Sequence, residues 1–193
     1  MSFEQLVRVP LERVAALIGK KGETKKRLED ACHVSLEIHG ESGEVTVRST
    51  SPEEGDPFKA MTVVEAIGRG FSPERALRLL EPDVSLEVMD LREFAGKSEN
   101  SLERIRGRII GLNGKSRRVI EELTKCQVSV YGRTVAIIGE VSEVKLAREA
   151  IEMLASGARH ASVYNMLQKA RTKRKMDRVL LWEDQSPEVE PRQ

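Results

Sequence analysis

Residues 110–123 read IGLNGKSRRVIEEL, and residues 18–31 read IGKKGETKKRLEDA. Four of the 14 aligned positions are identical, and five more are conservative exchanges. After a gap of two residues the match resumes, with Cys32–Leu36 aligned to Cys126–Val130. Solenoid repeats recur every ~20–50 residues. The offset here is 92 residues, so the pattern predicts a duplicated domain.

The same order of elements is predicted around both stretches. Each copy begins with a strand and two amphipathic helices that meet at a Gly-x-x-Gly turn. A hairpin with alternating apolar residues follows, and then a helix with one apolar stripe. The fold class is therefore α+β, with the order βααββα used twice. The elements are expected at Leu6–Val9, Leu11–Ile18, Glu23–Ala31, a hairpin from Val34 to Val47 and a helix around Ala60–Ile67, and again at Val84–Met89, Ser98–Ile110, Lys115–Lys125, a hairpin from Val128 to Ile138 and a helix around Val144–Leu154.

The boundaries follow from the turn residues and from a change in composition. Ser72-Pro73 is typical of a helix start and predicts a short helix to Leu80, ahead of the break at Glu81-Pro82-Asp83. We expect domains at 1–82 and 83–160, and a basic C-terminal helix within 161–182, from Val163 to about Arg178. The acidic, proline-containing segment 183–193 is expected to be disordered.

The formal charge of +1, from 32 basic and 31 acidic residues, hides an uneven distribution. Segments 20–27, 104–118 and 169–178 carry +4, +6 and +5, which leaves −14 for the rest. Such concentrated basic segments favour a nucleic-acid ligand. The seven aromatic residues are scattered, which argues against the stacking platforms of RRM and OB folds.

The Gly-x-x-Gly turns have a chemistry suited to phosphate. Glycine permits positive φ and close approach of a ligand, and the helix that follows begins with free N–H groups. The apolar residues just before each turn, and Val34 and Val128 on the strand that follows, are expected to contact bases. The candidate contacts are Ile18, Gly19, Lys20, Lys21, Gly22 and Lys25 in the first copy; Ile110, Gly111, Leu112, Asn113, Gly114, Lys115, Arg117 and Arg118 in the second; and Arg171, Lys173 and Arg174 in the C-terminal helix.

The helix–GxxG–helix unit resembles the KH domain, whose GxxG loop clamps about four nucleotides of a single strand. The runs 107–124 and 128–139, the latter containing YGRTVAIIG, are similar to the second KH domain of the archaeal two-KH ribosomal RNA-processing family. That family is the counterpart of the eukaryotic partner-of-Nob-one factor. The resemblance covers about residues 3–180 and implies two tandem type I KH domains. Leu112 departs from the family, in which this loop position is usually basic.

The resemblance implies a non-catalytic factor of small-subunit ribosome maturation that binds single-stranded RNA near the 3′ end of the small-subunit rRNA. The implied partners are the PIN-domain endonuclease that trims this end and the alpha subunit of initiation factor two. Two alternatives stay open. One is a protein adaptor for a nuclease or initiation factor with secondary RNA binding. The other is an accessory subunit of RNA degradation, although no S1 barrel sequence is visible.

Other chemistries find little support in the sequence. Gly114-Lys115-Ser116 lacks the earlier glycine of a Walker A loop, since Ile109 stands there. The three histidines and two cysteines show no metal-ligand spacing, and Cys32 and Cys126 are expected to be buried packing residues at equivalent places. No nucleophile motif, cofactor site, signal peptide or membrane-spanning run is found. The sequence predicts a cytoplasmic protein without enzymatic activity, cofactor or metal.

Overall fold

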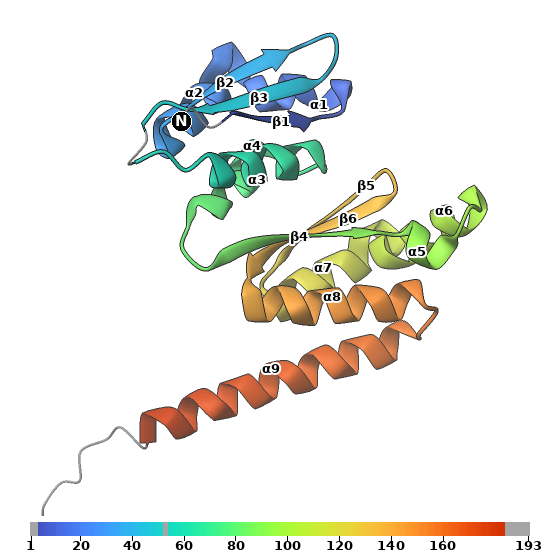
Figure 1. Ribbon diagram of the computed structural model, residues 1–193. Coiled ribbons are helices and arrows are strands. Elements are labelled where there is room, and N and C mark those ends of the chain that lie inside the picture. The colour runs from blue at the N-terminus through green and yellow to red at the C-terminus, as the bar shows by residue number, and fades with distance from the viewer. Residues whose placement is uncertain (1–3, 52–53, 184–193) are drawn as a thin grey trace, which may run out of the picture.

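The computed structural model describes residues 4–51 and 54–183, which form two α+β domains followed by one long helix (Figure 1). The predicted α+β class and the repeated βααββα order are confirmed. The first domain contains β1 (Glu4–Arg8), α1 (Leu11–Ile18), the 3-10 turn η1 (Lys20–Gly22), α2 (Glu23–Cys32), β2 (Val34–His39), β3 (Glu44–Ser49) and α3 (Pro57–Gly68).

The second domain follows a short helical connection and repeats this plan with one additional short helix after its first strand. The connection is formed by α4 (Pro73–Ala76) and the 3-10 turn η2 (Leu77–Leu80). The domain itself contains β4 (Val84–Asp90), α5 (Arg92–Ala95), α6 (Glu99–Ile110), η3 (Leu112–Gly114), α7 (Lys115–Thr124), β5 (Gln127–Tyr131), β6 (Thr134–Glu140) and α8 (Val141–Ala155), and α9 (His160–Glu183) follows it.

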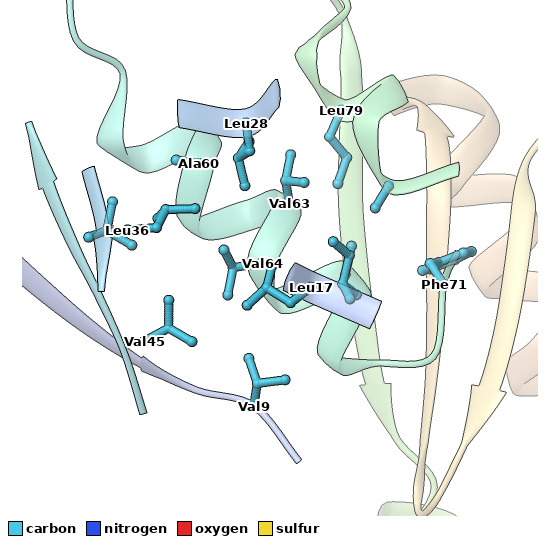
Figure 2. Close-up of a cluster of buried hydrophobic side chains, with 14 of the residues drawn as sticks. Val9, Leu17, Leu28, Leu36, Val45, Ala60, Val63, Val64, Phe71 and Leu79 are labelled. Carbon is cyan, nitrogen blue, oxygen red and sulfur yellow. The ribbon is translucent and has the colours of Figure 1, made fainter. Parts of the chain in front are cut away.

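Each domain has a three-stranded antiparallel sheet whose last strand lies in the middle, in the orders β1-β3-β2 and β4-β6-β5. Alternation along the strands decides which face packs on the helices. In β2, Leu36 is buried and lies opposite the buried Val47 of β3, whereas Glu37 is exposed. Figure 2 shows the resulting core, in which Leu17, Leu28 and Leu36 lie among side chains from α3 and the sheet.

The second sheet is buried on both faces. All of Thr134–Gly139 in β6 is buried. Val135 and Ile137 belong to the core of the second domain, but Ala136 and Ile138 pack with the core of the first domain, together with Phe71 and Leu79. Strands buried on both faces have nearly continuous apolar sequences. This double burial explains the run TVAIIG.

The first sheet differs, because its outer face is charged. Arg48 in the middle strand makes ion pairs of 3.0 Å with both Glu4 and Glu37, which lie on the two neighbouring strands. Arg8 pairs with Glu44 at 2.7 Å. The duplication therefore produced two sheets with opposite requirements, one packed against a domain and one carrying exposed ion pairs.

Polar contacts add to the packing between the two domains. The Ser129 hydroxyl donates to the carbonyl of Arg69 at 2.9 Å, and the Tyr131 hydroxyl donates to the Glu12 carboxylate. A Cβ on Gly70 would lie 2.8 Å from the Ser129 hydroxyl oxygen, so the backbones approach closely here. The domains are thus held together by an apolar and polar interface rather than joined only by the connection.

The structure corrects the alignment of the two copies. The left-handed residues that end α2 and α7 are His33 and Lys125, which lie 92 residues apart, so no gap is needed. Cys126 is consequently equivalent to Val34, and Cys32 is equivalent to Thr124. Both cysteines are 2% exposed, as expected of packing residues, but they are not at equivalent positions.

The C-terminal helix α9 is longer than the stretch Val163–Arg178 predicted from sequence. It continues at both ends because neither glycine nor proline occurs between Gly157 and Pro187. Of the segment 183–193, expected to be disordered, 184–193 lie outside the described residues. Within 4–51 and 54–183, no helix is long and apolar enough to cross a membrane.

Candidate nucleic-acid interface

The two GxxG turns have the same backbone conformation. Gly19 and Gly111 have φ of 75° and 72°, with ψ of 178° and 174°. The second variable residue is left-handed in both, at φ 57° for Lys21 and 51° for Asn113. Gly22 and Gly114 follow with φ of 79° and 74°. The sequence repeat therefore encodes a repeated backbone turn.

The two glycines of each turn have different physical roles. A Cβ on Gly19 would lie 2.2 Å from the Thr24 hydroxyl oxygen, and one on Gly111 would lie 2.7 Å from the Ser116 Cβ. The first glycine is therefore needed for packing of the turn on its helix. A Cβ on Gly22 or Gly114 would meet nothing within 4 Å, so here the backbone is open to a ligand.

The helices that follow the turns begin without a side-chain cap. Neither α2 nor α7 has a side chain that accepts a hydrogen bond from its first N–H groups. Gly22 and Gly114 donate their own N–H groups to the carbonyls of Gly19 and Gly111, at 3.3 and 3.1 Å. The exposed N–H groups and the positive end of each helix dipole suit an anionic group.

The variable residues of the two turns differ in charge. Lys20 and Lys21 are exposed, and no ion pair engages either of them among the described residues. Leu112 is 84% exposed, and the Asn113 carbonyl accepts a hydrogen bond of 3.3 Å from Arg118. The first turn thus presents two cations where the second presents an apolar side chain and an amide.

Two of the predicted phosphate contacts also serve the fold. Lys25 lies 3.8 Å from Glu29, and Arg117 lies 3.9 Å from Glu121. Both carboxylates also accept a backbone N–H of the next strand, from Leu36 at 2.7 Å and from Val128 at 2.9 Å. The positive charge of Lys25 and Arg117 is therefore partly balanced internally, whereas Lys115 and Arg118 are exposed without an ion pair in the described chain.

The apolar part of the predicted site needs one correction. Ile18 is 36% exposed and Ile110 is half-buried beside its turn, so both present some apolar surface. Val34 and Val128, expected to contact bases, are only 3% and 1% exposed. Their side chains point to the helix-covered face of each sheet, so they cannot contact a base in this conformation.

Arginine side chains account for part of the charge counted in the sequence without being available to a ligand. Arg108 donates to the carbonyls of Leu154 and Ala158, at 3.0 and 2.5 Å. Arg13 donates to Ile67 and Phe71 carbonyls in the same way. These carbonyls lie at or just beyond the C-terminal ends of α8 and α3, where a helix has no backbone donor for them. The +6 counted over 104–118 therefore overstates the charge available to a ligand.

The three candidate residues of α9 do not form one surface. Arg171 and Arg174 line a cleft between α9 and the second domain, and Arg174 pairs with Glu143 at 2.9 Å. Lys173 lies on a different face of the helix. The same cleft holds Lys175 and Arg178, which were not among the sequence candidates. Their helical spacing from Arg171 was the signal that could have identified them.

The cysteines have the character of core thiols. Burial raises the pKa of Cys32 to about 11, with a smaller contribution from Asp56, and burial likewise raises the pKa of Cys126 to about 11. A thiol of this pKa is protonated at neutral pH and is a weak nucleophile or ligand. No group of three or more His, Cys, Asp or Glu residues suited to a metal occurs within the part of the chain that the structure describes.

Comparisons with known proteins agree with this geometry. Residues 85–172 match the eukaryotic-type KH domain (KH-domain type I), and residues 4–57 match the KH domain. The KH domain-containing protein MJ0443 of Methanocaldococcus jannaschii is 48% identical over 185 residues, which is 94% of this chain and 80% of that protein.

Two further relatives are connected with rRNA by name. The pre-rRNA-processing protein PNO1 of Chaetomium thermophilum is 32% identical over 82% of this chain and 62% of that protein. A chain in the crystal structure of an a/eIF2alpha–aDim2p–rRNA complex from Pyrococcus horikoshii is 45% identical, with a TM-score of 0.83, over 89% of this chain and 96% of that chain. This chain therefore belongs to the PNO1/Dim2-like family of proteins with two KH domains.

Proposed function

We propose that the protein is a non-catalytic RNA-binding factor of pre-rRNA processing. The observation that carries the proposal is the pair of equivalent turns in which Gly22 and Gly114 leave the backbone open at the start of an uncapped helix. The relatives support it, because one is named a pre-rRNA-processing protein and another was crystallised with rRNA.

Each turn binds the backbone of a single strand by two kinds of contact. The N–H groups at the start of α2 and α7 meet a phosphate that approaches the open glycine, and nearby cations such as Lys20 and Lys115 neutralise it. Ile18 and Ile110 offer apolar surface beside the turn for a base or ribose. One KH domain holds about four nucleotides in this way.

We propose that the RNA bound by the protein is the region near the 3′ end of the small-subunit rRNA. The protein would present this region to the PIN-domain endonuclease that trims it, without acting on a bond itself. We propose the alpha subunit of initiation factor two as a further partner, supported by the complex in which the Pyrococcus horikoshii relative was crystallised.

The test is to place negative charge at the tips of the turns. Lys20-Lys21 and Leu112-Asn113 are each replaced by Asp-Asp, because all four side chains are exposed and the fold should tolerate the change. Both variants are expected to lose affinity for single-stranded rRNA 3′-end oligonucleotides, while Lys20-Lys21→Arg-Arg keeps it. If both Asp-Asp variants melt normally and bind as the wild type does, the turns are not the RNA site.

A second function, protein adaptor, is favoured by the initiation-factor subunit in the relative's complex. It is compatible with RNA binding, because a factor can present RNA to an enzyme while holding another protein. Affinity purification from native cells, with and without exhaustive RNase treatment, separates the two. Partners that remain after RNase support the adaptor role, and partners that disappear are held through RNA.

A further inference from the structure

Helix α9 changes the chemistry of its inward face halfway along. Val163 and Leu167, both fully buried, pack it against the second domain. Continuing at helical spacing, the same side of the helix carries Arg171, Arg174 and Arg178. Figure 1 shows α9 running antiparallel to α8 and continuing past the beginning of that helix. The aliphatic stripe therefore becomes a cationic one where α9 passes the end of the domain.

This cationic stripe lines a cleft that is open to solvent. The cleft measures about 1010 Å³ and lies between α9, the end of α7 and the corner where β6 meets α8. Four cations of α9 line it at spacings i, i+3, i+4 and i+7, and Lys125 at the end of α7 supplies a fifth. They are Arg171, Arg174, Lys175, Arg178 and Lys125.

The cleft contains fewer carboxylates than cations. Glu140 and Glu143 are its acidic lining residues. Glu143, whose side chain is 10% exposed, is engaged by Arg174 at 2.9 Å. Arg171, Lys175, Arg178 and Lys125 make no ion pair with any described residue and are exposed. Four exposed cations, three on α9 and one at the end of α7, therefore line the cleft without an ion pair to any residue that the structure describes.

The opposite, outer face of α9 differs from the face that lines the cleft. Met176 and Leu180 are 63% and 62% exposed there, beside Lys169 and Lys173. A helix selected only for solubility would place its apolar side chains inward and its cations outward. In this half of α9 the apolar Met176 and Leu180 lie on the outer face, and three arginines follow the buried Val163 and Leu167 on the inward face. An anionic ligand on the inward face would account for the arginines there.

We propose that the cleft is a second RNA-backbone site that holds phosphates of the strand bound by the second GxxG turn. Seven of its ten lining residues are charged, whereas the centres of protein–protein interfaces are poor in charge. Arginine matches phosphate geometry with paired N–H donors. The ten residues of α7 separate the turn from the cleft by about 15 Å, so one strand can reach both. The inference rests on the proposed RNA-binding function.

The test compares the two faces of α9 with oligonucleotides of two lengths. Arg171→Gln with Arg178→Gln removes two charges from the cleft, and Lys169→Gln with Lys173→Gln removes two from the outer face. Arg174 is kept because it pairs with Glu143. Binding is measured against salt for an oligonucleotide of about four nucleotides, which fills one KH groove, and for one of about twelve.

The cleft variant is expected to bind the short oligonucleotide as the wild type does. For the long one, the slope of log affinity against log salt should become shallower by about 1.4, from two lost phosphate contacts at about 0.7 each. The outer-face variant should match the wild type. The proposal would be overturned if the salt slope became equally shallow in both variants, or if it did not change in the cleft variant. It would also be overturned if the cleft variant bound an acidic peptide more weakly but bound RNA as the wild type does.

The same data separate this inference from the proposed function. Suppose that Leu112-Asn113→Asp-Asp no longer binds the short oligonucleotide, while the cleft variant binds both oligonucleotides as the wild type does. The KH site would then stand, and the cleft would be rejected as an RNA site. If the wild type does not bind the short oligonucleotide at all, the KH assignment fails. The long oligonucleotide would then still report whether Arg171 and Arg178 contact RNA.

Discussion

Exchanging residues between the two GxxG turns tests whether the charge of their variable residues contributes to RNA binding. Exchanging their variable residues, so that Lys20-Lys21 becomes Leu-Asn, moves the first turn to the composition of the second. The backbone conformations already agree, and asparagine accepts the left-handed position of residue 21 more readily than lysine. The exchange should therefore change the free energy of unfolding by no more than about 0.5 kcal/mol.

The magnitude of the effect on RNA binding follows from counterion release. Lys20 and Lys21 are exposed and make no ion pair with a described residue, so both are available to phosphates. Each lost contact to a single strand removes about 0.7 from the slope of log affinity against log salt, or about 1.4 for the pair. Between about 50 and 200 mM salt, the variant should consequently lose about sevenfold less affinity than the wild type.

Fluorescence anisotropy of a labelled rRNA 3′-end oligonucleotide, titrated at several salt concentrations, measures this slope. The reverse exchange, Leu112-Asn113→Lys-Lys, serves as the matched partner and should steepen the slope by a similar amount. Thermal unfolding confirms that both variants are folded. Unchanged slopes in both variants would refute the reasoning, because they would mean that neither pair of side chains lies near phosphate.

Three further outcomes are expected. Gly111→Ala should lower stability by more than Gly114→Ala in urea unfolding, since both have positive φ but only at Gly111 would the new Cβ clash, with Ser116. Arg108→Ala should cost about 2–4 kcal/mol of unfolding free energy, because two carbonyls lose a charged donor. The raised pKa of Cys32 and Cys126 gives stability that is present below pH 9 and is lost as pH rises toward 11, so Cys→Ala variants should show a weaker decline between these values.

The local fold could be predicted well from the sequence, but the packing between the two domains could not. Glycine spacing, alternation in the strands and the 92-residue offset depend on neighbouring residues, so the turns and the element order could be predicted. The burial of Ala136 and Ile138 against the first domain depends on a distant partner. The engagement of Arg108 by carbonyls near residue 154 is equally nonlocal, so a charge count along the chain could not exclude it.

Divergence between the two domains follows a consistent physical logic. The first domain has a doubly charged turn, and its sheet presents ion pairs such as Arg48–Glu4 to solvent. The second has a neutral turn at Leu112-Asn113, and its sheet is covered by the first domain. What the second turn lacks in charge lies instead on α9, whose Arg171 and Arg178 face the cleft beside α7. The backbone turn is therefore the same in both copies, whereas the cations that would complete the proposed RNA sites lie on the turn itself in the first domain and on α9 beside the second.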